Sequence, residues 1–268
     1  MMRADVHMHT NFSHDSKSAP EEMILGAIAK GLQAVCFTDH HDKDDFAWGP
    51  EEVFEPEEYF KVMPPLRDKY KDKIDVRIGV EIGLQPYLEP FYREFVKKYP
   101  FDFVIGSVHS THKLDIAHGE IFDGKTDEEV YREVLEEMLE DVRIYEDYDV
   151  LGHLDYMIRY GKDKEQAYSY LKYAELIDEI LKNIIAKGKG LELNMAGLKY
   201  GLPYAHPHPD VLKRYRELGG EIITVGADGH CPEHIAWDFD KANGILRACG
   251  FTYYTDFKQR KPVFKQLS

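Results

Sequence analysis

Residues Val76-Arg77-Ile78-Gly79-Val80-Glu81 form a short, mostly apolar run that ends at a carboxylate. A run of this length rich in Val and Ile is typical of a buried β-strand. An unpaired carboxylate at the end of such a strand is costly, so Glu81 needs a cation or an ion-pair partner. Similar runs recur along the chain. We expect seven strands, over Ala4–His7, Ala34–Thr38, Val76–Glu81, Phe103–Val108, Val150–His153, Gly190–Asn194 and Ile222–Gly226.

Longer amphipathic stretches separate these strands. The clearest predicts a helix over Asp127–Glu146, and a second is expected over Asp163–Lys187 with Gly188 as its C-cap. Strands that alternate with helices predict repeated β-α units, and right-handed crossovers make neighbouring strands parallel. No linker, low-complexity tract or short repeat interrupts the pattern, so we expect residues 1–268 to form a single domain.

The composition excludes several classes of protein. The chain has 268 residues, of which 43% are hydrophobic and 13% aromatic, enough for a core and too many for a disordered chain. A formal net charge of −15 argues against a binder of long nucleic acids. No apolar run reaches the ~18 residues that span a membrane, and no signal peptide is evident. Three cysteines fit neither a disulfide framework nor a thiolate zinc site, and we expect a cytoplasmic protein.

Nearly every expected strand stops at a histidine or a carboxylate. In a closed barrel the C-terminal ends of parallel strands meet on one face, where barrel active sites are built. Imidazoles and carboxylates gathered there without thiolates favour a Zn, Mn or Fe site. Taken alone, His7 and His9 are better explained as surface or core histidines, and this holds more strongly for His109 or His153, but the conjunction argues for metal. The strand-end residues are His7, His9, Asp39, His40, Glu81, His109, His153, Asp155, Asn194, Asp228 and His230.

Six short motifs contain most of these residues. They are Asp5-Val6-His7-Met8-His9-Thr10, Phe37-Thr38-Asp39-His40, Gly79-Val80-Glu81, Gly106-Ser107-Val108-His109, Gly152-His153-Leu154-Asp155 and Ala227-Asp228-Gly229-His230. In this order they resemble the polymerase-and-histidinol-phosphatase (PHP) family over almost the entire chain. The branch of monofunctional L-histidinol-phosphate phosphatases is the most similar. Its features here are Asp115-Ile116, Phe122-Asp123-Gly124-Lys125 and the stretch from Gly152 to Tyr160.

The resemblance implies a distorted (β/α)7 barrel, consistent with the seven expected strands, with its active site at the strand C-termini. It also implies three divalent metal ions, Zn, Mn or Fe, and assigns Glu81, Asp228 and His230 to catalysis. The usual Ser-Asp-Ala-His appears here as Ala227-Asp228-Gly229-His230, and His14 is a rival ligand to Asp15. The implied ligands are His7, His9, Glu81 and Asp228 for the first metal, Glu81, His109 and His153 for the second, and Asp15, His40 and His230 for the third.

Such a cluster suits hydrolysis of a phosphate ester. Two cations that share the Glu81 carboxylate can bridge a hydroxide and lower its pKa, and the cations together neutralise the phosphoryl oxygens. The resemblance implies a phosphomonoesterase that converts L-histidinol phosphate to L-histidinol and phosphate in histidine biosynthesis. Two alternatives stay open. The same site could act on nucleotides or nucleic-acid ends, or the chain could be a non-catalytic metal-binding barrel.

Two polar residues outside the ligand set are candidates for binding substrate. Arg159 follows His153 by six residues, and its guanidinium suits a phosphate dianion, although a surface salt bridge explains it equally well. Asn194 ends a strand and could orient substrate or a ligand, or could simply cap a turn. His206 and His208 alternate with prolines, and we expect them in a surface loop.

Overall fold

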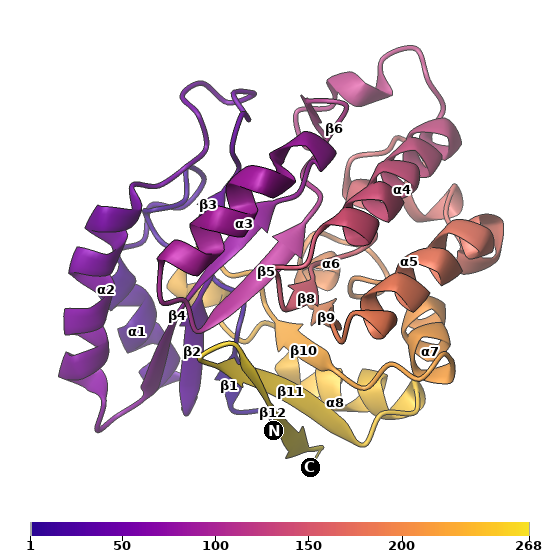
Figure 1. Cartoon of the computed structure of the whole chain (residues 1–268). Coiled ribbons are helices and arrows are strands. Elements are labelled where there is room, and N and C mark those ends of the chain that lie inside the picture. Colours follow the sequence, from indigo (N-terminus) through magenta and orange to yellow (C-terminus); the bar gives the residue numbers. More distant parts are fainter. Residues whose placement is uncertain (1, 268) are drawn as a thin grey trace.

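Seven parallel strands form the centre of the structure, a computed structural model that describes residues 2–267. Each strand pairs with the next one in the sheet, in the order in which the chain forms them. Figure 1 shows these strands in the middle of the molecule with helices around them. Within the described residues they are β1 (Ala4–Asp5), β2 (Ala34–Phe37), β4 (Asp75–Gly83), β5 (Phe103–Ser107), β8 (Val150–Leu151), β9 (Gly190–Asn194) and β10 (Ile223–Gly226).

The first and last strands meet just beyond β1 and β10. Met8 pairs with Gly229 in a parallel bridge, and the N–H of His9 donates to the carbonyl of Gly229 at 2.8 Å. The N–H of Asp228 donates to the carbonyl of His7 at 2.9 Å. This seam joins the two edges of the sheet at the C-terminal ends of the strands. The expected distorted (β/α)7 barrel is therefore confirmed, and each expected strand is present.

The helices α1 to α7 lie in the connections between the barrel strands, as β-α units require, and α8 follows the last of these strands. Three short strands lie in loops on the C-terminal side, and one of them, β3, pairs His40 with Glu81 of β4. The helices are α1 (Pro20–Ala29), α2 (Pro56–Tyr70), α3 (Glu89–Lys98), α4 (Asp127–Ile144), α5 (Ala174–Ala186), α6 (Ala196–Lys199), α7 (Pro209–Glu217) and α8 (Phe239–Ala248). The short strands are β3 (His40–His41), β6 (Ser110–Thr111) and β7 (Leu114–Asp115).

The helix α4 begins where its sequence provides a cap. The Thr126 hydroxyl accepts a hydrogen bond from the N–H of Glu129, and the Glu129 carboxylate accepts one from the N–H of Thr126 at 2.8 Å. This reciprocal pair satisfies two N–H groups that a helix start leaves free. The apolar side of the helix is buried, Val130 included. The helix expected over Asp127–Glu146 is present and ends two residues earlier, at Ile144.

The expectation of one long helix over Asp163–Lys187 is wrong. Only α5 is α-helical there, and two short 3₁₀ turns precede it. The carboxylate of Asp127 accepts hydrogen bonds from three successive N–H groups at positions 162–164, and the Ser169 hydroxyl accepts another. Both acceptors, the distant Asp127 carboxylate and the local Ser169 hydroxyl, compete with helical pairing for these N–H groups. Gly188 follows the end of α5 with φ +66°, the left-handed conformation expected after a helix.

A C-terminal hairpin closes the opposite end of the barrel. It consists of β11 (Tyr253–Lys258) and β12 (Lys261–Gln266), and Figure 1 shows it beside both chain termini. Phe257 stacks on Phe103 with 5.0 Å between ring centroids, and Nε of Arg260 donates to Asp149 at 2.6 Å. Among residues 2–267, the barrel is therefore covered at this end and open at the C-terminal ends of its strands. Phe257 packs on an apolar interior of Ala4, Val6, Ala34, Cys36, Phe103, Ile105 and Val150.

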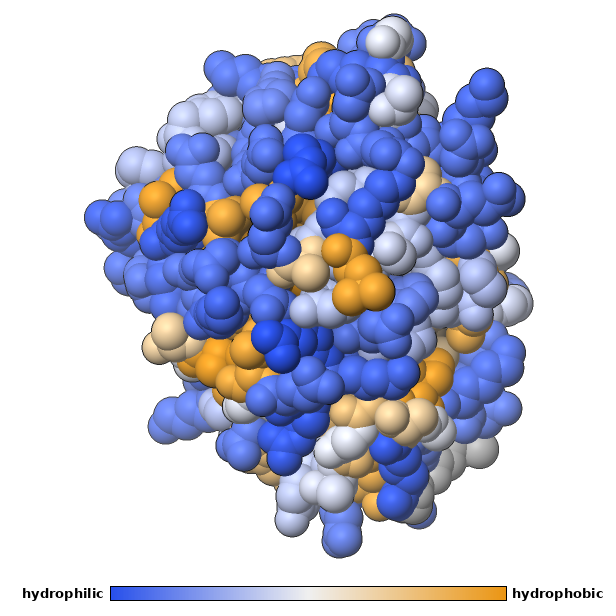
Figure 2. Space-filling view, turned by 90° about the vertical axis from the view of Figure 1, so that its right-hand side faces the viewer, coloured by the Kyte–Doolittle hydropathy of each residue, from blue (hydrophilic) through white to orange (hydrophobic). Residues whose placement is uncertain are grey.

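The outer surface on the side of α4, α5 and α7 is mainly hydrophilic. Figure 2 shows this face, on which hydrophobic areas are small and separate. Glu128, Glu136 and Glu140 of α4 are exposed and contribute to the net charge of −15. None of the helices in residues 2–267 has the length and apolarity that crossing a membrane requires.

Candidate metal centre

The open end of the barrel collects the side chains that end the strands. Glu81 lies near the C-terminal end of β4. The other residues lie on β3 or in the segments that follow β1, β5, β8 and β10. Most are buried, and Asp15 is the most exposed, with 39% of its side chain accessible. The structure therefore brings together all of the expected ligands, which are His7, His9, Asp15, His40, Glu81, His109, His153, Asp228 and His230.

Glu81 lies at the centre of this cluster and is fully buried. Its Oε2 lies 3.1 Å from Nε2 of His7, and its Oε1 lies 3.0 Å from Nε2 of His153. The Ser107 hydroxyl donates a hydrogen bond to Oε1 at 2.6 Å and fixes the orientation of the carboxylate. Burial alone would raise the pKa of Glu81, but the imidazoles, His7 and His109 foremost, hold that pKa well below its usual value. The two oxygens of one ionised carboxylate thus face different groups of histidines.

The Oε2 side of Glu81 contains the first group of donors. His7, His9 and Glu81 each place a ligand atom within 4.8 Å of the others. Asp228 belongs to the same group, because its Oδ1 lies 3.3 Å from Nε2 of His9. The Oε1 side contains the second group, in which Nε2 of His109 lies 3.4 Å from Nε2 of His153 and both lie within reach of Glu81.

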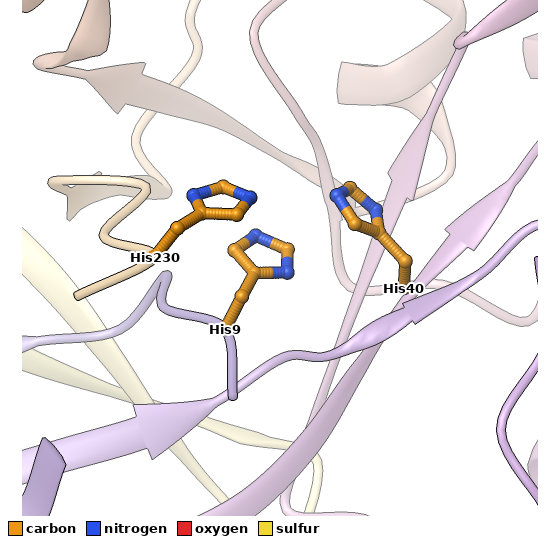
Figure 3. A group of neighbouring side chains, drawn as sticks. All are labelled: His9, His40 and His230. Carbon is orange, nitrogen blue, oxygen red and sulfur yellow. The ribbon is translucent and has the colours of Figure 1, made fainter. Parts of the chain in front are cut away.

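The third group lies nearer the surface. Figure 3 shows the rings of His9, His40 and His230 close together, and their nitrogens lie within 4.8 Å of one another. Oδ2 of Asp15 lies 2.8 Å from Nε2 of His230 and 3.8 Å from Nε2 of His40. The rival ligand, His14, instead places Nδ1 3.1 Å from the Glu52 carboxylate. Of the two rival ligands, Asp15 is therefore the one that lies beside the histidines of the third group.

Two imidazoles of the cluster favour the neutral form that a cation needs, whereas nearby carboxylates raise the pKa of three others. Burial, with His230 and His40 nearby, holds the pKa of His9 well below its usual value. Burial also lowers the pKa of His153. A neutral imidazole offers a lone pair and an ionised carboxylate offers negative charge, which are the two kinds of ligand that a divalent cation needs. The donors are N and O atoms without thiolate, a set that fits Zn, Mn or Fe.

Comparison with known proteins agrees with this geometry. A model of the PHP domain matches residues 5–196, well over half of the chain. The chain belongs to the PHP domain family. A histidinol-phosphatase of Lactococcus lactis is 34% identical over 97% of this chain and 96% of its own length. A probable histidinol-phosphatase of Clostridium acetobutylicum is also 34% identical, over 97% of this chain and 95% of its own.

A solved structure extends this likeness to the fold. The crystal structure of histidinol phosphate phosphatase from Lactococcus lactis, complexed with zinc, L-histidinol and phosphate, matches this PHP domain with a TM-score of 0.89. The two are 33% identical, and the match covers 97% of this chain and 98% of that one. The family indicated by the sequence motifs is therefore confirmed.

Two carboxylates behind the cluster of this PHP domain were not expected from the sequence. Oε1 of Glu192 lies 2.6 Å from Nδ1 of His7, and Oδ1 of Asp42 lies 3.0 Å from Nδ1 of His109. Each orients an imidazole so that Nε2 faces the cluster. A signal existed for Glu192, because a fully buried charge between Leu191 and Leu193 needs a partner.

A cavity of about 670 Å³ opens above the cluster of the PHP domain. Arg159 lines it, as expected, but is largely buried and makes no surface salt bridge. Its guanidinium lies 5.0 Å from the ring centroid of Tyr156 and 4.7 Å from that of Tyr200. One terminal nitrogen is 3.5 Å from Oδ2 of Asp228 and has no hydrogen-bond partner among the described residues. This nitrogen is itself buried beside Asp228, while the Arg159 residue as a whole lines the cavity.

Asn194 does not line the cavity. Its Nδ2 lies 3.1 Å from Glu192 and 3.4 Å from Asp228, and its Oδ1 accepts the N–H of Ala196 at 2.9 Å. The side chain is fully buried. The expectation that Asn194 touches substrate is therefore not supported, because it lies behind Asp228 and caps the turn after β9.

The expectation that His206 lies in a surface loop is wrong. His206 is fully buried, and its Nδ1 lies 2.5 Å from Oδ1 of Asp155. Its N–H and carbonyl pair with the backbone of Asn194, which draws the loop against the end of β9. Spacing between prolines does not reveal such long-range pairing. His208 is partly exposed and accepts the N–H of Asp210 at the start of α7.

Proposed function

We propose that this protein is a metal-dependent phosphatase that hydrolyses L-histidinol phosphate to L-histidinol and phosphate. The observation that carries the proposal is the shared cavity, which is lined both by expected metal ligands such as His109 and Asp228 and by Arg159. Donors for cations and a donor for a phosphoryl oxygen are the two requirements of phosphate ester hydrolysis. The likeness to a relative complexed with zinc, L-histidinol and phosphate supports this substrate.

We infer that three divalent cations are held by the groups described above, with Glu81 shared by two of them. Such cations lower the pKa of bound water to supply the nucleophile and neutralise the phosphoryl oxygens. Around them, the protein fixes the ligands. Ser107 holds the shared carboxylate, while Glu192 and Asp42 orient His7 and His109. A rigid shell of this kind lowers the reorganisation that the reaction needs.

Arg159 is placed to bind the phosphoryl group. The rings of Tyr156 and Tyr200 both lie against the guanidinium, and one of its terminal nitrogens lies 3.5 Å from Oδ2 of Asp228. An arginine donates charge-assisted hydrogen bonds to phosphate oxygens and keeps its charge at any working pH.

One wall of the cavity favours a cationic leaving group. Glu52 and Asp115 line it, and Oε1 of Glu52 is buried without a hydrogen-bond partner. Burial, together with Asp42 and Asp45, raises the pKa of Glu52 to about 9, and burial raises that of Asp115. An ammonium group against this wall would offset the repulsion among the carboxylates and favour their ionised form. L-histidinol carries such a group, and the sugar of a mononucleotide does not.

We also propose that the whole chain forms one barrel domain, because the seam joins residues 7–9 to residues 228–229. We propose a cytoplasmic location, where thiols stay reduced. Cys36, Cys231 and Cys249 are all free thiols.

The test is a comparison of substrates after reconstitution with Mn, Fe or Zn. L-histidinol phosphate, mononucleotides and p-nitrophenyl phosphate are assayed, and kcat/KM for L-histidinol phosphate should exceed the others by at least about tenfold. Glu52→Gln should narrow that preference, whereas the exposed Glu58→Gln is the matched control that should not. A higher kcat/KM for a mononucleotide would instead favour a nucleotide phosphatase.

A further inference from the structure

Three side chains form a buried row beside the metal centre. Oδ1 of Asp155 lies 2.5 Å from Nδ1 of His206, and Nε2 of His206 lies 2.9 Å from Nε of Arg159. Asp155 and His206 are fully buried, and Arg159 has 7% of its side chain exposed. The row leads from the loop before α7 to the cavity, and none of its members belongs to the metal groups described above.

The hydrogen-bonding capacities of the outer members fix the state of the middle one. An arginine Nε–H only donates, so Nε2 of His206 must accept. A carboxylate accepts, so Nδ1 of His206 must carry the proton and donate to Asp155. His206 is therefore neutral with its proton on Nδ1. Burial, which lowers the pKa of His206, agrees with a neutral ring.

Asp155 and His206 are both held in place by backbone hydrogen bonds. Oδ2 of Asp155 accepts the N–H of His208 at 2.7 Å, and the backbone of His206 pairs with that of Asn194 at 2.7 and 2.8 Å. With Nε occupied by His206 and the two tyrosine rings alongside, the guanidinium has one orientation. In that orientation Arg159 lines the cavity, with one terminal nitrogen 3.5 Å from Oδ2 of Asp228.

We propose that Asp155 and His206 are positioning residues that aim the Arg159 guanidinium at the phosphoryl group of the substrate. The proposal rests on the proposed phosphatase function and extends it to two residues that touch neither metal nor substrate. A donor that is misplaced by about 1 Å can cost up to about a hundredfold in rate. Loss of either residue should therefore lower kcat/KM while metal content stays unchanged.

Two substitutions of His206 separate positioning from structural support. In His206→Gln, Oε1 can take the place of Nε2 and accept from Arg159. In His206→Asn, Nδ2 can take the place of Nδ1–H and donate to Asp155, but nothing reaches Arg159. Positioning predicts that the glutamine variant retains clearly more kcat/KM than the asparagine variant. Simple structural support by the bond to Asp155 predicts the reverse order.

Asp155→Asn provides an independent test of the same row. An asparagine amide that donates to Nδ1 of His206 would move the ring proton to Nε2, where it would meet the Nε–H of Arg159. Two donors would then face each other, so this variant should lose about as much kcat/KM as His206→Asn. The control is His208→Asn, because asparagine also caps a helix start and His208 does not contact Arg159.

The experiment measures kcat and KM with L-histidinol phosphate and with p-nitrophenyl phosphate, the inhibition constant of inorganic phosphate, and metal content. We expect His206→Asn and Asp155→Asn to lose about ten- to a hundredfold in kcat/KM on both esters and to bind phosphate more weakly. In an Arg159→Ala background, the further effect of His206→Asn should largely vanish. Equal losses in His206→Gln and His206→Asn, or a full loss in the Arg159→Ala background, would overturn the proposal.

The outcome also distinguishes this proposal from the proposed function. If the parent enzyme hydrolyses p-nitrophenyl phosphate but not L-histidinol phosphate, the substrate assignment fails. The order of the His206 variants on p-nitrophenyl phosphate then still decides the positioning role. If the parent hydrolyses neither ester, calorimetric binding of inorganic phosphate to the metal-loaded protein gives the same order or contradicts it.

Discussion

The carboxylate of Glu192 lies 2.6 Å from Nδ1 of His7, deep in the barrel. Burial would lower the pKa of His7, but the negative charges of Glu192 and Glu81 raise it well above its usual value. Nδ1 of the His7 ring contacts Glu192, and Nε2 of the same ring faces Glu81. A carboxylate in this position makes an imidazole a better ligand.

Glu192→Gln should weaken metal binding although Glu192 is no ligand itself. The substitution keeps the shape and removes the charge behind His7, so metal affinity should fall about 10- to 100-fold. Competition with a chelator of known affinity measures it. Glu175→Gln, at an exposed carboxylate, is the control. Unchanged affinity in Glu192→Gln would mean that the contact with His7 serves only packing.

Glu81→Gln should have the largest effect of any single ligand substitution. It removes the charge that two groups of donors share and replaces one coordinating oxygen by a nitrogen that cannot bridge. Metal content should fall in both groups, and turnover should fall by several orders of magnitude. His153→Asn, at a ligand of one group, should reduce occupancy mainly at a single site. Full metal content and near-native turnover in Glu81→Gln would make Glu81 a structural carboxylate.

Arg159→Ala should raise KM and leave metal content unchanged. The lost charge-assisted bond to phosphate should cost about 1.5–3 kcal/mol in kcat/KM. Steady-state kinetics and elemental analysis measure the two quantities. Arg93→Ala, at an exposed arginine, is the matched control. Unchanged kcat/KM would leave Arg159 with no part in binding substrate.

Sequence pattern predicted the barrel and the members of the cluster because both depend on local features. Each strand is a short apolar run, and a strand such as β4 carries its functional residue, Glu81, at a fixed place near its end. Parallel order then brings distant strand ends together without further information. The same logic found His7 and His230, which stand 223 positions apart in the sequence.

Features that depend on long-range partners were not predictable. The helix expected over Asp163–Lys187 is shortened by the carboxylate of Asp127, which lies in another helix. His206 is buried because its backbone pairs with Asn194, a contact that no periodicity reveals. Nothing in the sequence pattern singles out Asp42, and only the folded chain shows that it orients His109.

Removal of metal should lower both activity and stability. The cluster gathers buried imidazoles and carboxylates, which repel or stay poorly solvated without cations. Reconstituted protein should contain up to three divalent ions per chain, and a chelator should abolish turnover. At a free metal concentration of 100 Kd, each site stabilises the fold by about 2.7 kcal/mol, so the melting temperature should fall on chelation. Less than one ion per chain, or activity that survives exhaustive chelation, would contradict the hydrolytic mechanism.

Asp141, far from the cluster on α4, should make stability fall as the pH rises. It is fully buried, and neither carboxylate oxygen has a hydrogen-bond partner among the described residues. Burial, reinforced by Glu137 and Glu140, raises its pKa well above the usual value. The folded chain thus keeps a proton that the unfolded chain loses above about pH 3.9, and this stabilisation is lost as the pH rises through the folded-state pKa.

Asp141→Asn, which cannot ionise, should match the parent in free energy of unfolding near pH 4 and exceed it at pH 8. Denaturant titrations at both pH values measure the difference, with the exposed Glu140→Gln as control. A gain of equal size at both pH values would show that Asp141 does not titrate in the folded state.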